Sequence, residues 1–153
     1  MNDKIYGWED FSNGQTWQNQ RSMALQQDEI IAFAKKFDPL IVHTDPELAL
    51  NEPLGMHCAS GVHTFALSQR MLCDALFTRT KVVAGHRIDC FVMRKPVVAG
   101  DVLSITAEVL ETKAHHRRED CGWVTFTVKV YVEGVTVLSY DVTVLIGRRH
   151  RAG

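Results

Sequence analysis

The chain has 153 residues, of which 46% are hydrophobic and 23% charged, and its formal net charge is −1. These values are typical of one globular domain, which we expect to extend over residues 1–153. The small net charge gives no general attraction to nucleic acid or to an acidic membrane surface, and no apolar run is long enough to cross a bilayer.

The N-terminal residues and the cysteines both indicate a cytoplasmic protein. The start of the chain lacks the basic-then-apolar order of a secretion signal. Cysteines stand at positions 58, 73, 90 and 121, without a C-x-x-C pair. This spacing is poor for zinc and gives no disulfide framework, so we expect four reduced thiols and no metal site.

The first half of the chain has apolar residues at helical spacing. Residues 28–37 predict a short helix, which must end near Asp38 because Pro39 disfavours helical geometry at the residue before it. A second short helix is expected over 44–50, where Asp45 is a good N-cap. Residues 58–77 predict one long helix, so apolar that it should be mostly buried, with small first residues that allow another backbone to approach.

The second half of the chain alternates apolar and polar residues, as strands do. Tight turns are expected at 133–134 and 100–101, and a polar hairpin tip at 115–120. The expected strands lie within residues 14–25, 86–97, 102–110, 123–132 and 135–146. One long helix with about five antiparallel strands predicts an α+β fold in which the sheet wraps the helix. Such a sheet keeps free edges, so we expect a homodimer or a dimer of dimers.

Two acid–base groups stand close together in the stretch "FDPLIVHTDPELA". Asp38 and His43 are five positions apart, on what we expect to be a tight loop between the first two helices. A carboxylate beside an imidazole can share the proton transfers of one water, and the intervening residues from Leu40 to Val42 would keep bulk water away. The alternative is structural: Asp38 caps the preceding helix and His43 is a half-buried histidine.

The start of the long helix is a second candidate site. Its first amides lack intrahelical partners and carry partial positive charge, which would stabilise a carbonyl oxygen that gains negative charge. Gly55 allows close approach of a ligand, and the Ser60 hydroxyl can orient a neighbouring group. The alternative is ordinary helix packing, with Gly55 as a turn residue.

Other histidines and basic residues carry weaker signals. His57 and His63 are six apart, which is not the spacing that places two metal ligands on one helical face. The tip at 115–120 is expected to be a solvated turn, with a phosphate-binding patch as the alternative. The tail "RRHRAG" is expected to be a frayed end.

Three motifs together resemble the MaoC-like hydratases and dehydratases, which have the hot-dog fold. They are "FAKKFDPLIVHTDPELAL", "EPLGMHCASGVHTFAL" and "RKPVVAGDVL", and the likeness extends from about Gly14 to Arg149. The resemblance implies addition or removal of water across the 2,3 double bond of an acyl thioester. The acyl carrier would be coenzyme A or a carrier protein, with the pantetheine arm in a tunnel that is often at a dimer interface. Coenzyme A would be part of the substrate, and no metal or redox cofactor is implied.

The resemblance also implies roles for particular residues. Asp38 and His43 would share the reacting water and the C2 proton, and Ser60 would position them. Backbone amides of Gly55, Met56 and His57 would hold the thioester oxygen. The residues expected near the bound substrate are Leu40, Val42, His63 and Arg94.

Position 40 departs from the family pattern. Well-known (R)-specific enoyl-CoA hydratases of this family have asparagine two positions after the aspartate, where this chain has Leu40. Two other functions fit the same fold: an acyl-CoA thioesterase, and a non-catalytic module that binds acyl-CoA.

Overall fold

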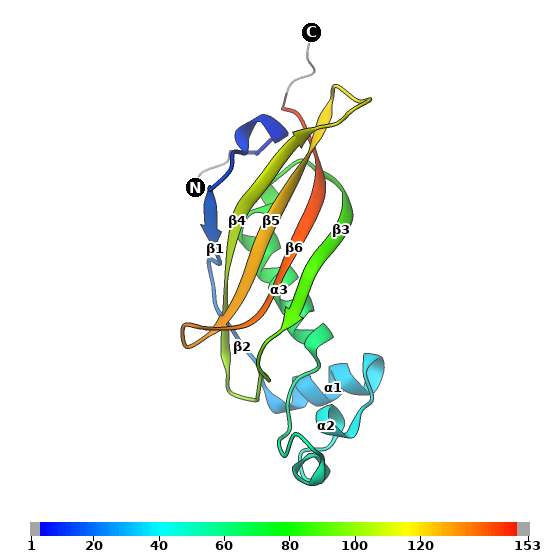
Figure 1. Ribbon diagram of the computed structural model, residues 1–153. Coiled ribbons are helices and arrows are strands. Elements are labelled where there is room, and N and C mark those ends of the chain that lie inside the picture. Colours follow the sequence, from blue (N-terminus) through cyan, green and yellow to red (C-terminus); the bar gives the residue numbers. More distant parts are fainter. Residues whose placement is uncertain (1–3, 150–153) are drawn as a thin grey trace.

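The computed structural model describes residues 4–149 and consists of one antiparallel sheet that curves around a central helix (Figure 1). The strand order is β1-β4-β5-β6-β3, and β2 also pairs with β4. The strands are β1 (Thr16–Gln18), β2 (Met23–Ala24), β3 (Val82–Met93), β4 (Val102–Ala114), β5 (Cys121–Val132) and β6 (Val135–Gly147). The predicted α+β layout is confirmed, with six strands in place of about five.

The additional strand arises because the segment predicted as one strand over 14–25 divides into β1 and β2. At the break, the Asn19 side chain joins its backbone as a partner of β4: its Oδ1 accepts a hydrogen bond of 2.8 Å from the Ile105 amide, while the Asn19 amide donates to the Ile105 carbonyl over 3.4 Å. Both halves remain on β4, with Trp17 opposite Ala107 and Met23 opposite Leu103. A polar side chain has therefore satisfied a backbone amide where the strand leaves the ladder.

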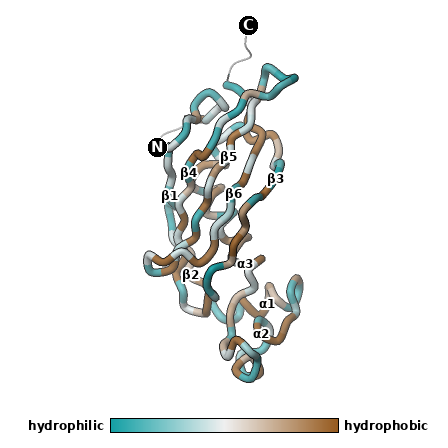
Figure 2. Tube along the Cα trace, in the orientation of Figure 1, coloured by the Kyte–Doolittle hydropathy of each residue, from teal (hydrophilic) through white to brown (hydrophobic). Residues whose placement is uncertain are grey.

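Helix α3 (Gly61–Ala75) lies across the concave face of the sheet and supplies one side of the core. Figure 2 shows apolar stretches along the strands and along α3. Of its apolar residues, Met71 and Leu72 are fully buried against sheet residues such as Phe126. The helix is buried on this face only, because the side chain of Val62 on the opposite face is 51% exposed. The prediction that α3 is mostly buried therefore holds for one face.

Two short helices gather at one end of the sheet, next to the start of α3 (Figure 1). Helix α1 (Gln27–Phe37) matches the predicted helix closely. The helix predicted over 44–50 is replaced by one α-helical turn, α2 (Ile41–Thr44), followed by a 3-10 turn over Leu48–Asn51. Asp45 caps as expected, although it serves the 3-10 turn: its Oδ1 accepts hydrogen bonds of 3.0 Å from the amides of Glu47 and Leu48.

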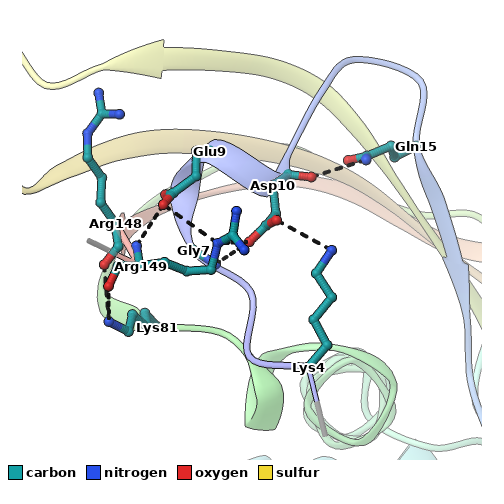
Figure 3. Close-up of polar contacts among 8 residues, drawn as sticks. All are labelled: Lys4, Gly7, Glu9, Asp10, Gln15, Lys81, Arg148 and Arg149. Atoms are coloured by element: carbon teal, nitrogen blue, oxygen red, sulfur yellow. Dashed lines mark hydrogen bonds and ion pairs between the residues drawn. The ribbon is translucent and has the colours of Figure 1, made fainter. Parts of the chain in front are cut away.

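The first and last described segments are tied together at the other end of the sheet, as Figure 3 shows. The Arg149 side chain lies 3.0 Å from the carboxylate of Asp10, and its backbone amide donates to Glu9 over 2.9 Å. Lys81 donates to the carbonyl of Arg148 over 3.1 Å. The prediction of a frayed tail is therefore wrong for residues 148 and 149, and residues 150–153 lie outside the described part of the chain.

The predicted turns are confirmed, and the tip at 115–120 joins β4 to β5. Glu133 and Gly134 both have positive φ (49° and 76°), as a tight hairpin turn requires. At the tip, Arg118 pairs with Asp120 at 2.8 Å, and both side chains are about half exposed. All four cysteines are free thiols, as predicted. Within residues 4–149, no helix combines the length and apolarity that a membrane crossing requires.

Strand β3 is an edge of the sheet, and among residues 4–149 its only neighbouring strand is β6. Every residue of β3 except Asp89 is exposed. Much of the exposed surface is apolar, and it comes from Val82, Val83, Ile88, Phe91, Val92 and Met93. A long apolar edge with unpaired backbone groups is uncommon on a monomer.

Candidate active site

The structure brings the side chains of Asp38 and His43 together. Asp38 is the C-cap of α1, and its backbone turns away from the helix before Pro39. The single turn of α2 then returns the chain, so that His43 Nε2 lies 3.6 Å from Asp38 Oδ2. The His43 side chain is 11% exposed and the Asp38 side chain is 28% exposed. His43 therefore lies on a short helix and not on the predicted loop, and this turn is what closes the distance.

The imidazole of His43 is fixed by a backbone carbonyl. His43 Nδ1 lies 2.7 Å from the carbonyl oxygen of Cys58. A carbonyl oxygen only accepts hydrogen bonds, so Nδ1 carries the proton in this contact. In the neutral ring, Nε2 then holds the lone pair that faces Asp38. This arrangement leaves Nε2 free to accept a proton from a bound molecule.

Asp38 is held by a serine that also begins the central helix. The Ser60 hydroxyl donates to Asp38 Oδ2 over 2.6 Å, a short bond to a charged acceptor. The Ser60 hydroxyl oxygen also accepts a hydrogen bond of 3.2 Å from the amide of Val62, which makes Ser60 the N-cap of α3. Ser60 is completely buried. The position of the carboxylate is therefore coupled to the start of the helix.

The pair opens into a cavity of about 320 Å³. Besides Asp38 and His43, its walls come from the start of α3, from the segment at 93–97 and from the beginning of β6. The walls are mainly apolar, with Ala59, Val97 and Leu138 among them. A carboxylate and an imidazole thus face a largely apolar space, in which electrostatic interactions are stronger than in water.

The cavity is lined by Gly61, at the start of α3, and not by the predicted segment 55–57. Gly61 lines the cavity and is the first residue of α3, where no acceptor among residues 4–149 receives its N–H. The Gly55 amide instead donates to the carbonyl of Glu52 over 2.8 Å, within its own turn. Gly55, Met56 and His57 are absent from the cavity wall. A Cβ on Gly61 would overlap the sulfur of Met93, so the small residue allows the segment at 93–97 to approach.

The small residues before α3 also admit a backbone, as the sequence predicted. The Ala59 amide donates to the carbonyl of Val97 over 2.8 Å. This bond joins the segment before α3 to the segment that follows β3. Two walls of the cavity that are nearly forty residues apart in the sequence are therefore joined by a backbone hydrogen bond.

The expected substrate-contacting residues have different positions. Leu40 and Ile41 are 57% and 44% exposed, so they do not shield the pair from water as predicted, because the turn of α2 directs them away from His43. Val42 is half-buried and outside the cavity wall. Arg94 does line the cavity, but its Nε donates to Ser139 over 3.2 Å, which restrains the guanidinium on β6.

His63 is buried away from the cavity. Its ring stacks face to face on Phe33 of α1, with centroids 4.3 Å apart and planes inclined by 5°. Its Nδ1 is buried and has no hydrogen-bond partner in the described part of the chain. Burial lowers the pKa of His63, although the charge of Glu29 acts in the opposite direction. His63 thus packs α1 against α3.

Several cavity residues were not recognised from the sequence. Thr64 is 1% exposed and lies one helical turn after Ser60, so the spacing of four residues was an available signal. Cys58 also lines the cavity, with its sulfur 3.8 Å from His43 Nδ1. Burial raises the pKa of the Cys58 thiol, which keeps it protonated and weakly nucleophilic.

Comparisons with known proteins agree with this architecture. The family model of the MaoC-like domain matches residues 10–132. The uncharacterized protein YdeM of Bacillus subtilis is 30% identical over 141 residues, covering 92% of this chain and 98% of YdeM. The structure of the MaoC-like dehydratase from Rhodospirillum rubrum has a TM-score of 0.88 and 27% identity, covering 95% of this chain and 99% of that one. The R-hydratase PhaJ1 of Pseudomonas aeruginosa shares the fold, with a TM-score of 0.69 at 20% identity, over 94% and 86% of the two chains. The chain therefore belongs to the MaoC-like hydratase/dehydratase family and has its hot-dog fold.

Proposed function

We propose that the protein adds water to, or removes it from, the 2,3 double bond of an acyl thioester. The observation that carries this proposal is the 3.6 Å contact between Asp38 Oδ2 and His43 Nε2 at the wall of a largely apolar cavity. Family membership supports hydratase or dehydratase chemistry in general. The acyl carrier would be coenzyme A or a carrier protein.

In the hydration direction, a water lies between the two catalytic side chains. As its oxygen bonds to C3, one member of the pair takes a proton from it, and a proton is returned to C2. The net result is addition of one water, and the pair returns to its starting protonation. His43 suits the role of base because its Nδ1–H is held by the Cys58 carbonyl and Nε2 is left with the lone pair. No electrons leave the substrate, so the proposed step needs no redox cofactor.

The intermediate state places negative charge on the thioester oxygen. Gly61 lines the cavity, and its amide, which has no acceptor in the described part of the chain, lies at the positive end of the α3 dipole. It would donate to this oxygen as the enolate forms. Gly61 thus takes the role that the sequence analysis gave to the amides of Gly55 to His57. Asp38, His43 and Gly61 all line the same cavity.

We further propose that two copies pair through β3. The 12-residue edge is apolar and unpaired, and antiparallel pairing of two β3 strands would bury it under two-fold symmetry. The edge ends at Met93, which lines the cavity together with the exposed Val62. The second copy would therefore cover the apolar rim of the active site.

The test is a panel of enoyl-CoA thioesters in which loss of the conjugated absorbance is followed. Wild-type protein should hydrate at least one short enoyl-CoA, and Asp38→Asn and His43→Ala should each reduce the rate by at least about a hundredfold. Asp74→Asn and His116→Ala, which change an exposed aspartate and an exposed histidine, serve as matched controls and should retain activity.

The alternatives give different results in the same assay. Release of free thiol from acyl-CoA without hydration would identify a thioesterase. Tight binding without turnover across all chain lengths would identify a binding module. Folded variants of Asp38 and His43 with wild-type turnover would refute the proposed mechanism.

A further inference from the structure

The imidazole of His57 contacts the backbone of the catalytic histidine. His57 Nε2 lies 2.8 Å from the carbonyl oxygen of His43. Because a carbonyl only accepts, Nε2 carries the proton and donates. His57 is half-buried and is absent from the cavity wall. His57 therefore contacts the backbone of His43 and does not line the space that a substrate would occupy.

Besides the 3.8 Å contact between Cys58 Sγ and His43 Nδ1, this bond is one of three that join residues 42–43 to residues 57–58. The Cys58 amide donates to the Val42 carbonyl over 3.1 Å. The His43 ring donates to the Cys58 carbonyl over 2.7 Å, and the His57 ring donates to the His43 carbonyl over 2.8 Å. The two segments thus exchange hydrogen bonds in both directions. The His57 ring is the only side chain of segment 57–58 that bonds to the backbone of residues 42–43.

The short helix that carries His43 needs such support. Helix α2 has four residues, too few to be stable through its own hydrogen bonds. Its first two residues, Ile41 and Val42, are exposed and half-buried, so packing holds this side of the turn weakly. The bond from His57 fixes the carbonyl of the same residue whose ring must face Asp38. Loss of this bond would release the His43 carbonyl, so that His43 would be held to segment 57–58 through its ring and through the neighbouring Val42 carbonyl only.

We propose that His57 is a positioning residue that sets the orientation of the His43 imidazole toward Asp38. This inference rests on the proposed hydratase function, because it assigns His57 a role in that reaction. His57 would affect the chemical step and not substrate binding, since its side chain does not reach the cavity. A displacement of about 1 Å in a catalytic group can reduce the rate of reaction by about a hundredfold.

The test compares His57→Leu with His57→Gln. Glutamine can present an amide N–H near the place of Nε2, whereas leucine keeps bulk but cannot donate. We expect His57→Leu to lower kcat at least about tenfold with KM changed less than about twofold, and His57→Gln to retain kcat within about threefold. Equal kcat in His57→Leu and wild type would overturn the inference, and so would an equal loss in both variants.

A third variant, His57→Asn, is the control for a folding defect in His57→Leu. Asparagine is polar but one methylene shorter than glutamine, so His57→Asn should not reach the His43 carbonyl. If His57→Leu fails to fold, the glutamine and asparagine variants provide the comparison, with the same tenfold difference in kcat expected between them. The rate is expressed per folded molecule from the circular dichroism signal, so that a loss of stability alone does not change it.

A second readout does not depend on turnover. The nitrogen-15 chemical shifts of His43 report which ring nitrogen carries the proton. In wild type, Nδ1 should be protonated and hydrogen-bonded, and His57→Leu should mix the two tautomers, whereas His57→Gln should not. If wild type hydrates no thioester, the proposed function fails while this spectrum still tests the positioning. Unchanged His43 shifts in His57→Leu would overturn it.

Discussion

Replacement of Ser60 by alanine should reduce both the stability and the activity of the protein. Its buried hydroxyl caps α3 through the Val62 amide at 3.2 Å and donates to Asp38 over 2.6 Å. Loss of an N-cap costs about 1 kcal/mol, and loss of a hydrogen bond to a charged group about 1.5–3 kcal/mol. The Asp38 side chain is 28% exposed, so water can replace part of the lost bond. We therefore expect Ser60→Ala to lower the free energy of unfolding by about 2 kcal/mol.

Turnover should fall because the carboxylate loses its fixed orientation. We expect kcat for enoyl-thioester hydration to fall about 10- to 100-fold in Ser60→Ala. Glycine is nearly as good an N-cap as serine but has no hydroxyl, so Ser60→Gly should lose the same activity with a smaller loss of stability. Urea denaturation and steady-state kinetics on the same preparations measure both quantities.

Ser68→Ala is the control for removal of a buried hydroxyl from α3. Ser68 is also fully buried, but it lies near Tyr140 at 2.8 Å, away from the catalytic pair. This variant should lose stability while its kcat stays near that of wild type. Wild-type turnover in both Ser60→Ala and Ser60→Gly would refute the reasoning that the serine orients Asp38.

Three further outcomes follow from the structure. Burial lowers the pKa of His63, so the native state favours the neutral ring; the stability it contributes is complete above the ordinary histidine pKa of about 6.5 and declines as the pH falls through that value. His63→Phe, which keeps the stack on Phe33, should therefore weaken the loss of urea stability between about pH 7.5 and about pH 5.5, and an unchanged loss would contradict this. Asp10→Ala should lower the free energy of unfolding by about 1–3 kcal/mol, because the buried Asp10 carboxylate accepts a hydrogen bond of 2.8 Å from the Gly7 amide and pairs with the Arg149 side chain at 3.0 Å. The control is Asp74→Ala, which removes an exposed ion pair with Arg70 and should lower it by less than about 0.5 kcal/mol. Ile88→Lys on β3 should convert a dimer to a monomer in sedimentation experiments, and Leu110→Lys, an equally exposed position on β4, should leave the dimer intact; a wild-type monomer would exclude pairing through β3.

The part of the site that is local in sequence could be predicted. Asp38 and His43 are close in the chain, and Pro39 signals the end of α1, so convergence of the two side chains needs only a turn. The walls at 93–97 and 137–138 could not be predicted in the same way. Their positions depend on which strand neighbours β6, and strand order is not encoded in the alternation of apolar residues.

The start of α3 was predicted three residues too early. The sequence predicts this helix from residue 58, but it begins at Gly61. Only the first turn of a helix has unpaired amides, so the candidate donors at the start of the helix move from residue 58 to Gly61, whereas the assignment of segment 55–57 rested on the family resemblance. Ser60 is a favoured N-cap residue and directly precedes the glycine, so this signal was available in the sequence.

The structure also changes the meaning of the leucine at position 40. This residue stands where well-known hydratases of the family have asparagine, which suggested a lost polar contact with the substrate. Leu40 is 57% exposed and is absent from the cavity wall, because α2 turns His43 inward and leaves Leu40 outside. Within one chain, its side chain therefore cannot contact the reacting water. We expect substrate preference to depend on residues that do line the cavity, among them Thr64, one helical turn beyond Ser60, and the apolar Val97.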